Sequence, residues 1–153
     1  MASLYLSLGT NLGDRRSNLE TALALIGRRI GTVTGASDII ETEPWGYESP
    51  NRFMNMAASV ETSLTPVQAL EAAKKIETEM GRTAKTGKDG YKDRIIDIDL
   101  LLYDDLVMET PELTIPHKLM HVRRFVLEPL AGIAPELEHP VLHKTINELL
   151  KEN

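Results

Sequence analysis

The hydrophobic residues in the first half of the chain follow two different periods. In SLYLSLG, residues 3–9, leucine occupies every second position, and this alternation predicts a strand. Leucine and isoleucine then recur at intervals of three or four, which predicts a helix over residues 15–30. Strand-like composition returns from residue 32 to about residue 40, and again in RFMNMAASVET, residues 52–62. The first half is therefore predicted to fold in the order β-α-β-β.

A second predicted helix carries its own start and stop signals. Thr65 stands directly before Pro66, the arrangement of an N-cap followed by proline in the first turn. An apolar stripe then continues to Met80, and Gly81 is suited to end the helix. The last predicted strand lies in DRIIDIDLLLYDD, residues 93–105.

The resulting order, β-α-β-β-α-β, is that of the ferredoxin-like α+β fold, in which an antiparallel sheet packs against helices. Additional short helices are expected at residues 122–131 and 145–151. A length of 153 residues indicates one domain, residues 1–153.

Composition and charge narrow the functional classes. The chain has no cysteine, which excludes disulfides, thiolate zinc sites and cysteine nucleophiles. It has no apolar run of the roughly 20 residues that a membrane span needs, and no basic segment before its first apolar stretch. The net charge of −6 argues against a nucleic-acid partner. We therefore expect a cytoplasmic protein with no membrane or nucleic-acid partner and, because no exposed apolar patch is indicated, a monomer.

Two acids interrupt the last predicted strand. Residues two apart share a face of a strand, so Asp97 and Asp99 project together, about 7 Å apart. Neighbouring carboxylates repel each other, and Mg²⁺, usually held by one or two carboxylates and substrate phosphates, would offset that repulsion. The alternative is that both acids lie at a solvated sheet edge, or that they pair with Lys92 and Arg94. On this alternation Leu101 and Tyr103 share the face of the acids, while Ile96, Ile98, Leu100 and Leu102 face a helix layer.

A basic segment precedes this strand in an otherwise acidic protein. Its cations are Arg82, Lys85, Lys88, Lys92 and Arg94. Such a segment suits a small anionic ligand, and cations beside a metal-binding strand are components of phosphoryl transfer. The alternative is a solvated surface loop.

Phe53 and Asn55 share a face of the third predicted strand. The ring and the amide would suit a flat polar heterocycle, although a phenylalanine in a strand more often belongs to the core.

Histidines in the last third of the chain allow two interpretations. His117, within IPHKLMHVRRF, is a candidate phosphate or nucleotide contact alongside Arg123, or else a structural loop histidine. His139 and His143 have no convergent partners in the sequence, and we expect both at the surface.

These motifs, in this order, resemble the 6-hydroxymethyl-7,8-dihydropterin pyrophosphokinase family of folate biosynthesis. The likeness runs through YLSLGTNLGD, ETEPWG, FMNMAASVETSLTP, IETEMGR, RIIDIDLLLY, LTIPH and RRFVLEPLAGIAPEL, nearly the whole chain. Its most specific parts are R-x-x-D-x-D followed by aliphatic residues, and the P-H…R-x-F block.

The resemblance implies a ferredoxin-like enzyme that moves the terminal pyrophosphate of ATP to the hydroxymethyl oxygen of 6-hydroxymethyl-7,8-dihydropterin and leaves AMP. It implies that Asp97 and Asp99 hold two Mg²⁺ ions bridging the ATP phosphates, and that Arg82 and Arg94 are catalytic with them. The implied pterin contacts are Thr42, Pro44, Trp45, Phe53, Asn55 and Phe125. The implied ATP contacts are Glu77, Arg82, Arg94, Thr114, His117, Lys118 and Arg123.

The chain departs from the family pattern in the basic segment. Ala84 stands where relatives often have arginine, and GYKDR, residues 90–94, is longer than their usual G-P-R. Lys85, Lys88 or Lys92 is a candidate replacement for the missing charge. Two other functions stay open: a non-catalytic nucleotide- or metal-sensing domain of the same fold, and a metal-dependent phosphohydrolase.

Overall fold

The computed structural model describes residues 1–43, 51–81 and 95–153. Its strands are β1 (Ala2–Thr10), β2 (Thr32–Ala36), β3 (Ile40–Thr42), β4 (Phe53–Thr62), β5 (Asp97–Tyr103), β6 (Met108–Glu109) and β7 (Thr114–Ile115). Its helices are α1 (Arg15–Arg29), α2 (Pro66–Glu79), α3 (Arg124–Ile133) and α4 (Ile146–Lys151), with a short 3₁₀ turn at Met120–Val122 before α3. The predicted β-α-β-β-α-β order is confirmed, as are both additional helices.

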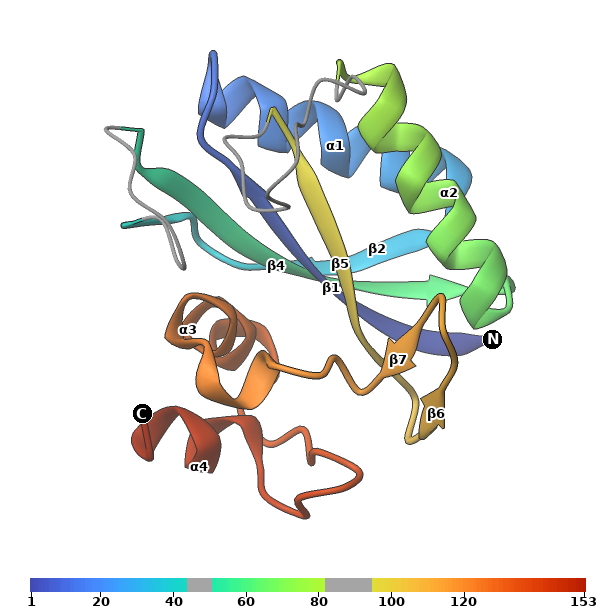
Figure 1. Cartoon of the computed structure of the whole chain (residues 1–153), viewed down its shortest axis with the longest axis vertical. Coiled ribbons are helices and arrows are strands. Elements are labelled where there is room, and N and C mark those ends of the chain that lie inside the picture. The colour runs from blue at the N-terminus through green and yellow to red at the C-terminus, as the bar shows by residue number, and fades with distance from the viewer. Residues whose placement is uncertain (44–50, 82–94) are drawn as a thin grey trace.

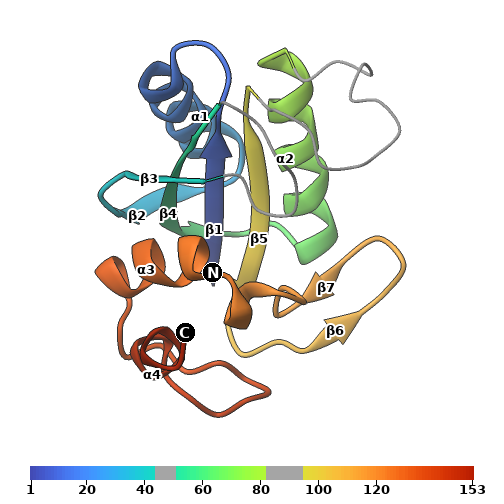
Figure 2. The ribbon, with the colours of Figure 1, turned by 60° about the vertical axis from the view of Figure 1, so that its left-hand side comes forward.

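The main sheet is antiparallel and has the order β2-β4-β1-β5, with β3 paired to β4 as well. Helices α1 and α2 cover one face of the sheet, and α3 and α4 lie on the other (Figure 1). Figure 2 shows the helices on the two faces of the sheet from another angle, with the β6–β7 hairpin next to the end of β5. The sequence pattern gave no sign of that hairpin.

The second predicted strand is divided in two. β2 pairs with the later part of β4, and β3 pairs with Phe53–Asn55 at its beginning. Ser37 bridges the break: its N–H donates to the Ala57 carbonyl (2.9 Å), and its hydroxyl accepts from the Ala57 N–H (2.8 Å). The backbone groups of β4 at the break are thus satisfied without a continuous strand.

Side-chain caps fix the ends of the helices. Asp14 accepts from the Ser17 N–H at the start of α1, and Thr65 forms a reciprocal capping box with Gln68 at the start of α2. Gly81, which follows the C-cap residue Met80 of α2, has φ +103°, a conformation that glycine adopts without a Cβ penalty. The start and stop signals predicted for α2 are confirmed.

A β-bulge in β5 makes its last two residues, Leu102 and Tyr103, face opposite to their predicted sides. The register pairs Leu6 with Leu100 but Tyr5 with Leu102, so Leu101 is the extra residue. Leu102 therefore turns to the α3–α4 core, opposite to its predicted side. Tyr103 turns the other way and donates its hydroxyl to the Leu64 carbonyl at 2.7 Å. Simple alternation is confirmed only from Ile96 to Leu101, ahead of the change in register.

Candidate active site

One face of the sheet brings the acids of β5 into line with β4. Gly9 of β1 pairs with Asp97 on one side and with Asn55 on the other. Directly paired residues share a face, and adjacent strands lie about 4.8 Å apart, so Asp97 and Asn55 stand about 10 Å apart across Gly9. In the next row Ser7 lies between Asp99 and Ala57. The predicted metal residues and the predicted pterin amide therefore occupy the same surface of the sheet.

Strand β3 completes the polar group beside Asn55. Thr42 pairs with Phe53, and the Asn55 side-chain nitrogen donates to the Thr42 hydroxyl at 2.7 Å. Asn55 is only 4% exposed, so this bond fixes the orientation of a buried amide. Three of the predicted pterin residues, Thr42, Phe53 and Asn55, are thus brought together.

Glu77 of α2 reaches the strand between the two acids. Its carboxylate accepts from the backbone N–H of Ile98 at 2.7 Å, and Glu77 itself is 4% exposed. β5 is the last strand of the described sheet, so its outward N–H groups lack a strand partner. Glu77 satisfies one of them directly between Asp97 and Asp99. A structural role for Glu77 was missed by sequence analysis, which treated it only as a nucleotide contact.

His117 follows β7 and is held by the backbone on both sides. Its N–H donates to the Leu101 carbonyl at 2.9 Å, and its Nδ1 accepts from the Leu119 N–H at 3.2 Å. Burial lowers the pKa of His117 to about 4; the Arg123 charge adds to this effect, and Asp97 opposes it. The imidazole is therefore neutral near pH 7, with its proton on Nε2. Such a ring donates one hydrogen bond and carries no charge.

Arg123 and Phe125 flank the start of α3. The Arg123 guanidinium carbon lies 5.6 Å from the centre of the Phe125 ring, within the range of a cation–π contact. Arg123 is 8% exposed, and α3 packs against β4 and also reaches β3. Of the remaining predicted nucleotide residues, Thr114 is partly buried in β7 and Lys118 is exposed. Pro44, Trp45, Arg82 and Arg94 lie outside the described residues, as do Ala84 and the three lysines of the basic segment.

The two later histidines differ from each other. His143 is exposed and lies 3.3 Å from a Glu138 carboxylate oxygen, so its predicted surface position is confirmed. His139 is only 4% exposed, and the prediction for it was wrong. Its Nδ1 accepts from the N–H groups of Val141 (3.2 Å) and Leu142 (3.1 Å), so the ring closes a turn.

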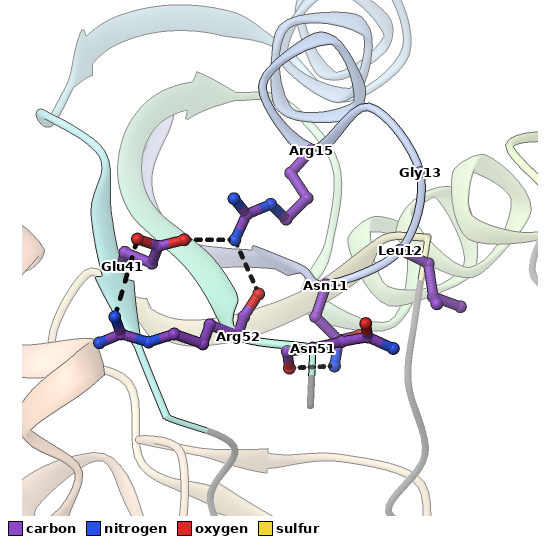
Figure 3. A pocket seen from close by; sticks show the side chains of 7 residues that line it. All are labelled: Asn11, Leu12, Gly13, Arg15, Glu41, Asn51 and Arg52. Carbon is purple, nitrogen blue, oxygen red and sulfur yellow. Dashed lines mark hydrogen bonds and ion pairs between the residues drawn. The ribbon is translucent and has the colours of Figure 1, made fainter. Parts of the chain in front are cut away.

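A pocket of about 360 Å³ opens near the same end of the sheet (Figure 3). It is lined by Asn11, Leu12, Gly13, Arg15, Glu41, Asn51 and Arg52. Arg15 bonds the Glu41 carboxylate at 2.6 Å and the Arg52 carbonyl at 2.9 Å, which ties the start of α1 to β3. The hydrogen bond from Arg15 holds the pKa of Glu41 below its usual value. Glu41 and Arg52 lie 26 and 37 positions after Arg15, so no local sequence pattern could have predicted these two contacts.

The fold and this face define a class: a ferredoxin-like α+β protein that carries paired carboxylates and a buried, oriented amide on one sheet surface. Comparison with known proteins gives the family. The model of the 7,8-dihydro-6-hydroxymethylpterin-pyrophosphokinase (HPPK) family matches residues 5–135. The chain therefore belongs to the HPPK family.

Individual relatives agree with this assignment. The chain is 46% identical over 141 residues to 2-amino-4-hydroxy-6-hydroxymethyldihydropteridine pyrophosphokinase of Porphyromonas gingivalis, covering 92% of this chain and 95% of that protein. It is 43% identical over 135 residues to the protein of the same name from Bacillus subtilis, covering 88% and 79%.

A solved structure shows the same fold. Plasmodium falciparum HPPK-DHPS superposes with a TM-score of 0.81 at 20% identity, over 99% of this chain. This chain spans 44% of that longer one.

Proposed function

We propose that the protein transfers pyrophosphate from ATP to 6-hydroxymethyl-7,8-dihydropterin, giving the pterin diphosphate and AMP in folate biosynthesis. Membership of the HPPK family is the observation that carries the proposal. Curated relatives at 43–46% identity are named as pyrophosphokinases. Their names support pyrophosphate transfer over the two alternatives, a sensing domain and a phosphohydrolase.

The pterin site lies, on this proposal, between β3, β4 and the start of α3. Asn55 offers a carbonyl oxygen and an amide already oriented by Thr42. Phe53 and Phe125 supply aromatic rings for a flat heterocycle. Pro44 and Trp45 are assigned to the same site by their motif alone. A polar ligand matched to a fixed buried amide loses affinity when that amide is removed.

Asp97 and Asp99 fit the coordination of Mg²⁺. Within residues 1–43, 51–81 and 95–153, no three histidine or acidic side chains converge to form a cage made by the protein alone. Two carboxylates on one strand face instead suit ions whose coordination is completed by substrate phosphates. Two Mg²⁺ ions held here would neutralise phosphate charge when bound.

The remaining residues serve the nucleotide on this proposal. Arg123 and Lys118 contribute positive charge for phosphate, and the neutral His117 donates a hydrogen bond from Nε2. The other proposed ATP contacts are Glu77, Arg82, Arg94 and Thr114, with Arg82 and Arg94 also catalytic. Their common task is alignment of the phosphate chain beside the pterin.

The reaction forms one P–O bond, breaks another, and releases the proton of the pterin hydroxyl to solvent. The pterin hydroxymethyl oxygen attacks the β-phosphorus of ATP, and the bond from that phosphorus to the α–β bridging oxygen breaks, so that AMP leaves. The row from Asn55 through Gly9 to Asp97 orients the two substrates along this line. Alignment and fixed charge, rather than covalent chemistry by the protein, supply the rate enhancement.

We further propose that residues 1–153 act as one domain, as a monomer, in the cytoplasm. Among the described helices, none is long and apolar enough to cross a membrane.

Incubation with ATP, Mg²⁺ and 6-hydroxymethyl-7,8-dihydropterin tests the activity. We expect AMP and pterin diphosphate in equal amounts, and no AMP when the pterin is omitted. Release of phosphate or pyrophosphate without pterin would indicate a phosphohydrolase instead. Ligand binding with no turnover would indicate a sensing domain.

A further inference from the structure

We propose that Gly9 is a positioning residue of the pterin site, and that its missing side chain is what allows the Asn55 amide to lie across β1. This inference deepens the proposed function and rests on it for the identity of the ligand. The contacts that support it lie on β1, β3 and β4, and β5 borders Gly9 on the other side.

The Asn55 amide occupies the space that a side chain on Gly9 would need. A Cβ built on Gly9 would lie 2.8 Å from Asn55 Oδ1, closer than such atoms are found, whereas the next neighbour, Phe53 Cδ1, lies at an ordinary 3.5 Å. Among the described residues, Asn55 is therefore the only one that would crowd a side chain at position 9. No positive φ is recorded for Gly9, so backbone conformation does not require glycine here.

Asn55 has little freedom to move aside. Its nitrogen is bonded to Thr42 at 2.7 Å, and its side chain is buried, so a rotation that relieved the clash would break that bond. A buried amide turned from its partner loses its orientation toward a ligand as well. Any side chain at position 9 thus acts on the pterin through Asn55.

Gly9 also lies between Asn55 and Asp97 in the cross-strand row. Its backbone forms the floor between the proposed pterin site and the proposed metal site.

The chain offers a matched control. Gly35 of β2 would place a Cβ 2.8 Å from Ser59 Oγ, the same distance to a side-chain oxygen of β4. Ser59 lies four residues from Asn55 along β4, about 13 Å away. Gly9→Ala and Gly35→Ala therefore introduce equal crowding near to and far from the proposed site.

Pterin binding, measured by calorimetry, should be about tenfold weaker in Gly9→Ala, the loss expected when one buried polar group is misaligned. Binding of an ATP analogue should change less than twofold, and Gly35→Ala should bind both ligands like the parent. The Asn55 side-chain NH₂ resonances should shift in Gly9→Ala and stay in place in Gly35→Ala. Normal pterin affinity in Gly9→Ala, or equal losses for both ligands, would overturn the proposal.

A double variant tests whether Gly9 acts through Asn55. Asn55→Ala removes the crowded oxygen, so adding Gly9→Ala to it should weaken pterin binding less than twofold further. Losses that simply add would overturn the proposal. If Gly9→Ala alone is too unstable to study, the double variant should have about the melting temperature of Asn55→Ala, because the crowded oxygen is absent. A double variant that melts well below Asn55→Ala would overturn the proposal.

The resonance shift and the recovery of melting temperature do not depend on catalysis. They distinguish a failure of this inference from a failure of the proposed reaction, which would appear as no AMP formation by the parent protein.

Discussion

At the scale of single residues, the two acids of β5 show what alternation can predict. Asp97 and Asp99 share a face with Gly9, Ser7 and Asn55, as expected for residues two apart. The same rule was wrong for Leu102 and Tyr103, because the bulge at Leu101 intervenes. Periodicity predicts a face only as far as the register continues, and a bulge depends on the partner strand.

The acids lead to the first prediction. Asp99→Asn should leave the fold intact and lower turnover by orders of magnitude, because on the proposed function it removes a carboxylate that positions phosphate-bound Mg²⁺. In metal-free buffer its melting temperature should equal or exceed that of the parent, since repulsion between neighbouring carboxylates is relieved. Circular dichroism melts and an AMP assay measure the two effects.

Asp105→Asn is the control for this change. It removes the same charge from an exposed position just beyond β5 and should turn over normally. If Asp99→Asn also turns over normally, the metal assignment is wrong.

His139 gives a prediction about pH. Burial lowers the pKa of His139, with His121 and His143 adding to the effect, and its Nδ1 accepts two backbone N–H groups. The folded state therefore favours the neutral ring. The contribution of the neutral His139 ring to the free energy of unfolding is complete above the pKa of the unfolded state, about 6.5. It is lost as pH falls from there toward the lower pKa of the folded state, at a slope of at most about 1.4 kcal/mol per pH unit.

His139→Asn separates this effect from other titrations. An asparagine oxygen at this position can accept from the same turn but does not titrate. The variant should be less stable than the parent at pH 7.5, and the difference should shrink by pH 5.5. Denaturant melts at the two pH values measure this; an unchanged difference would show that His139 is not the titrating group.

At the scale of elements, local signals predicted most of the fold and long-range pairing accounts for the rest. The caps of α2 and the alternation of β1 depend on residues close together in the sequence, and both predictions are confirmed. The β6–β7 hairpin has strands of two residues, too short for any period to be visible. The division between β2 and β3 depends on Ser37 reaching Ala57, a contact between residues 20 positions apart.

The same limit applies to the site. Strand alternation already paired Phe53 with Asn55, and only the family resemblance added Thr42; the hydrogen bond that joins Thr42 to Asn55 is visible in the structure alone. It missed Gly9, because a glycine's importance lies in what approaches it from another strand. It also missed the link from Glu77 to β5, for the same reason.

Glu77 provides the prediction at this scale. Glu77→Leu should lower the free energy of unfolding by about 1–3 kcal/mol, because the Ile98 N–H at the strand edge loses its acceptor. Glu77→Gln keeps an acceptor oxygen and should lose less. Urea melts of the two variants give the comparison, and hydrogen exchange at Ile98 should accelerate more in the leucine variant. If both variants were as stable as the parent protein, Glu77 would serve ligand binding alone.

At the scale of the whole molecule, the sheet separates two tasks. The face under α1 and α2 carries the larger apolar core, with Leu4, Leu6 and Leu8 fully buried. The other face packs α3 and α4 at one end and leaves the row of Asp97, Gly9 and Asn55 at the other. On the proposed function, stability and ligand chemistry are thus drawn from different parts of one sheet, and variants in the row of Asp97, Gly9 and Asn55 should fold.

That separation predicts independent effects of the two substrates on stability. A ligand that binds only the folded state at 100 times its Kd stabilises it by about 2.7 kcal/mol, or roughly 5–10 °C for a chain of this size. We therefore expect Mg²⁺ with a non-hydrolysable ATP analogue, and the pterin added to that complex, each to raise the melting temperature of the parent protein.

The two ends of the row should then be separable by mutation. Asn55→Ala should keep the increase from the Mg²⁺–nucleotide complex and lose most of the increase from the pterin, because the proposed function places the Asn55 amide against the heterocycle alone. Asp99→Asn should lose most of the nucleotide increase, because ion and phosphate bind together. Loss of both increases in Asn55→Ala would mean that the ends of the row are not independent, and that the amide holds the whole face in place rather than one substrate.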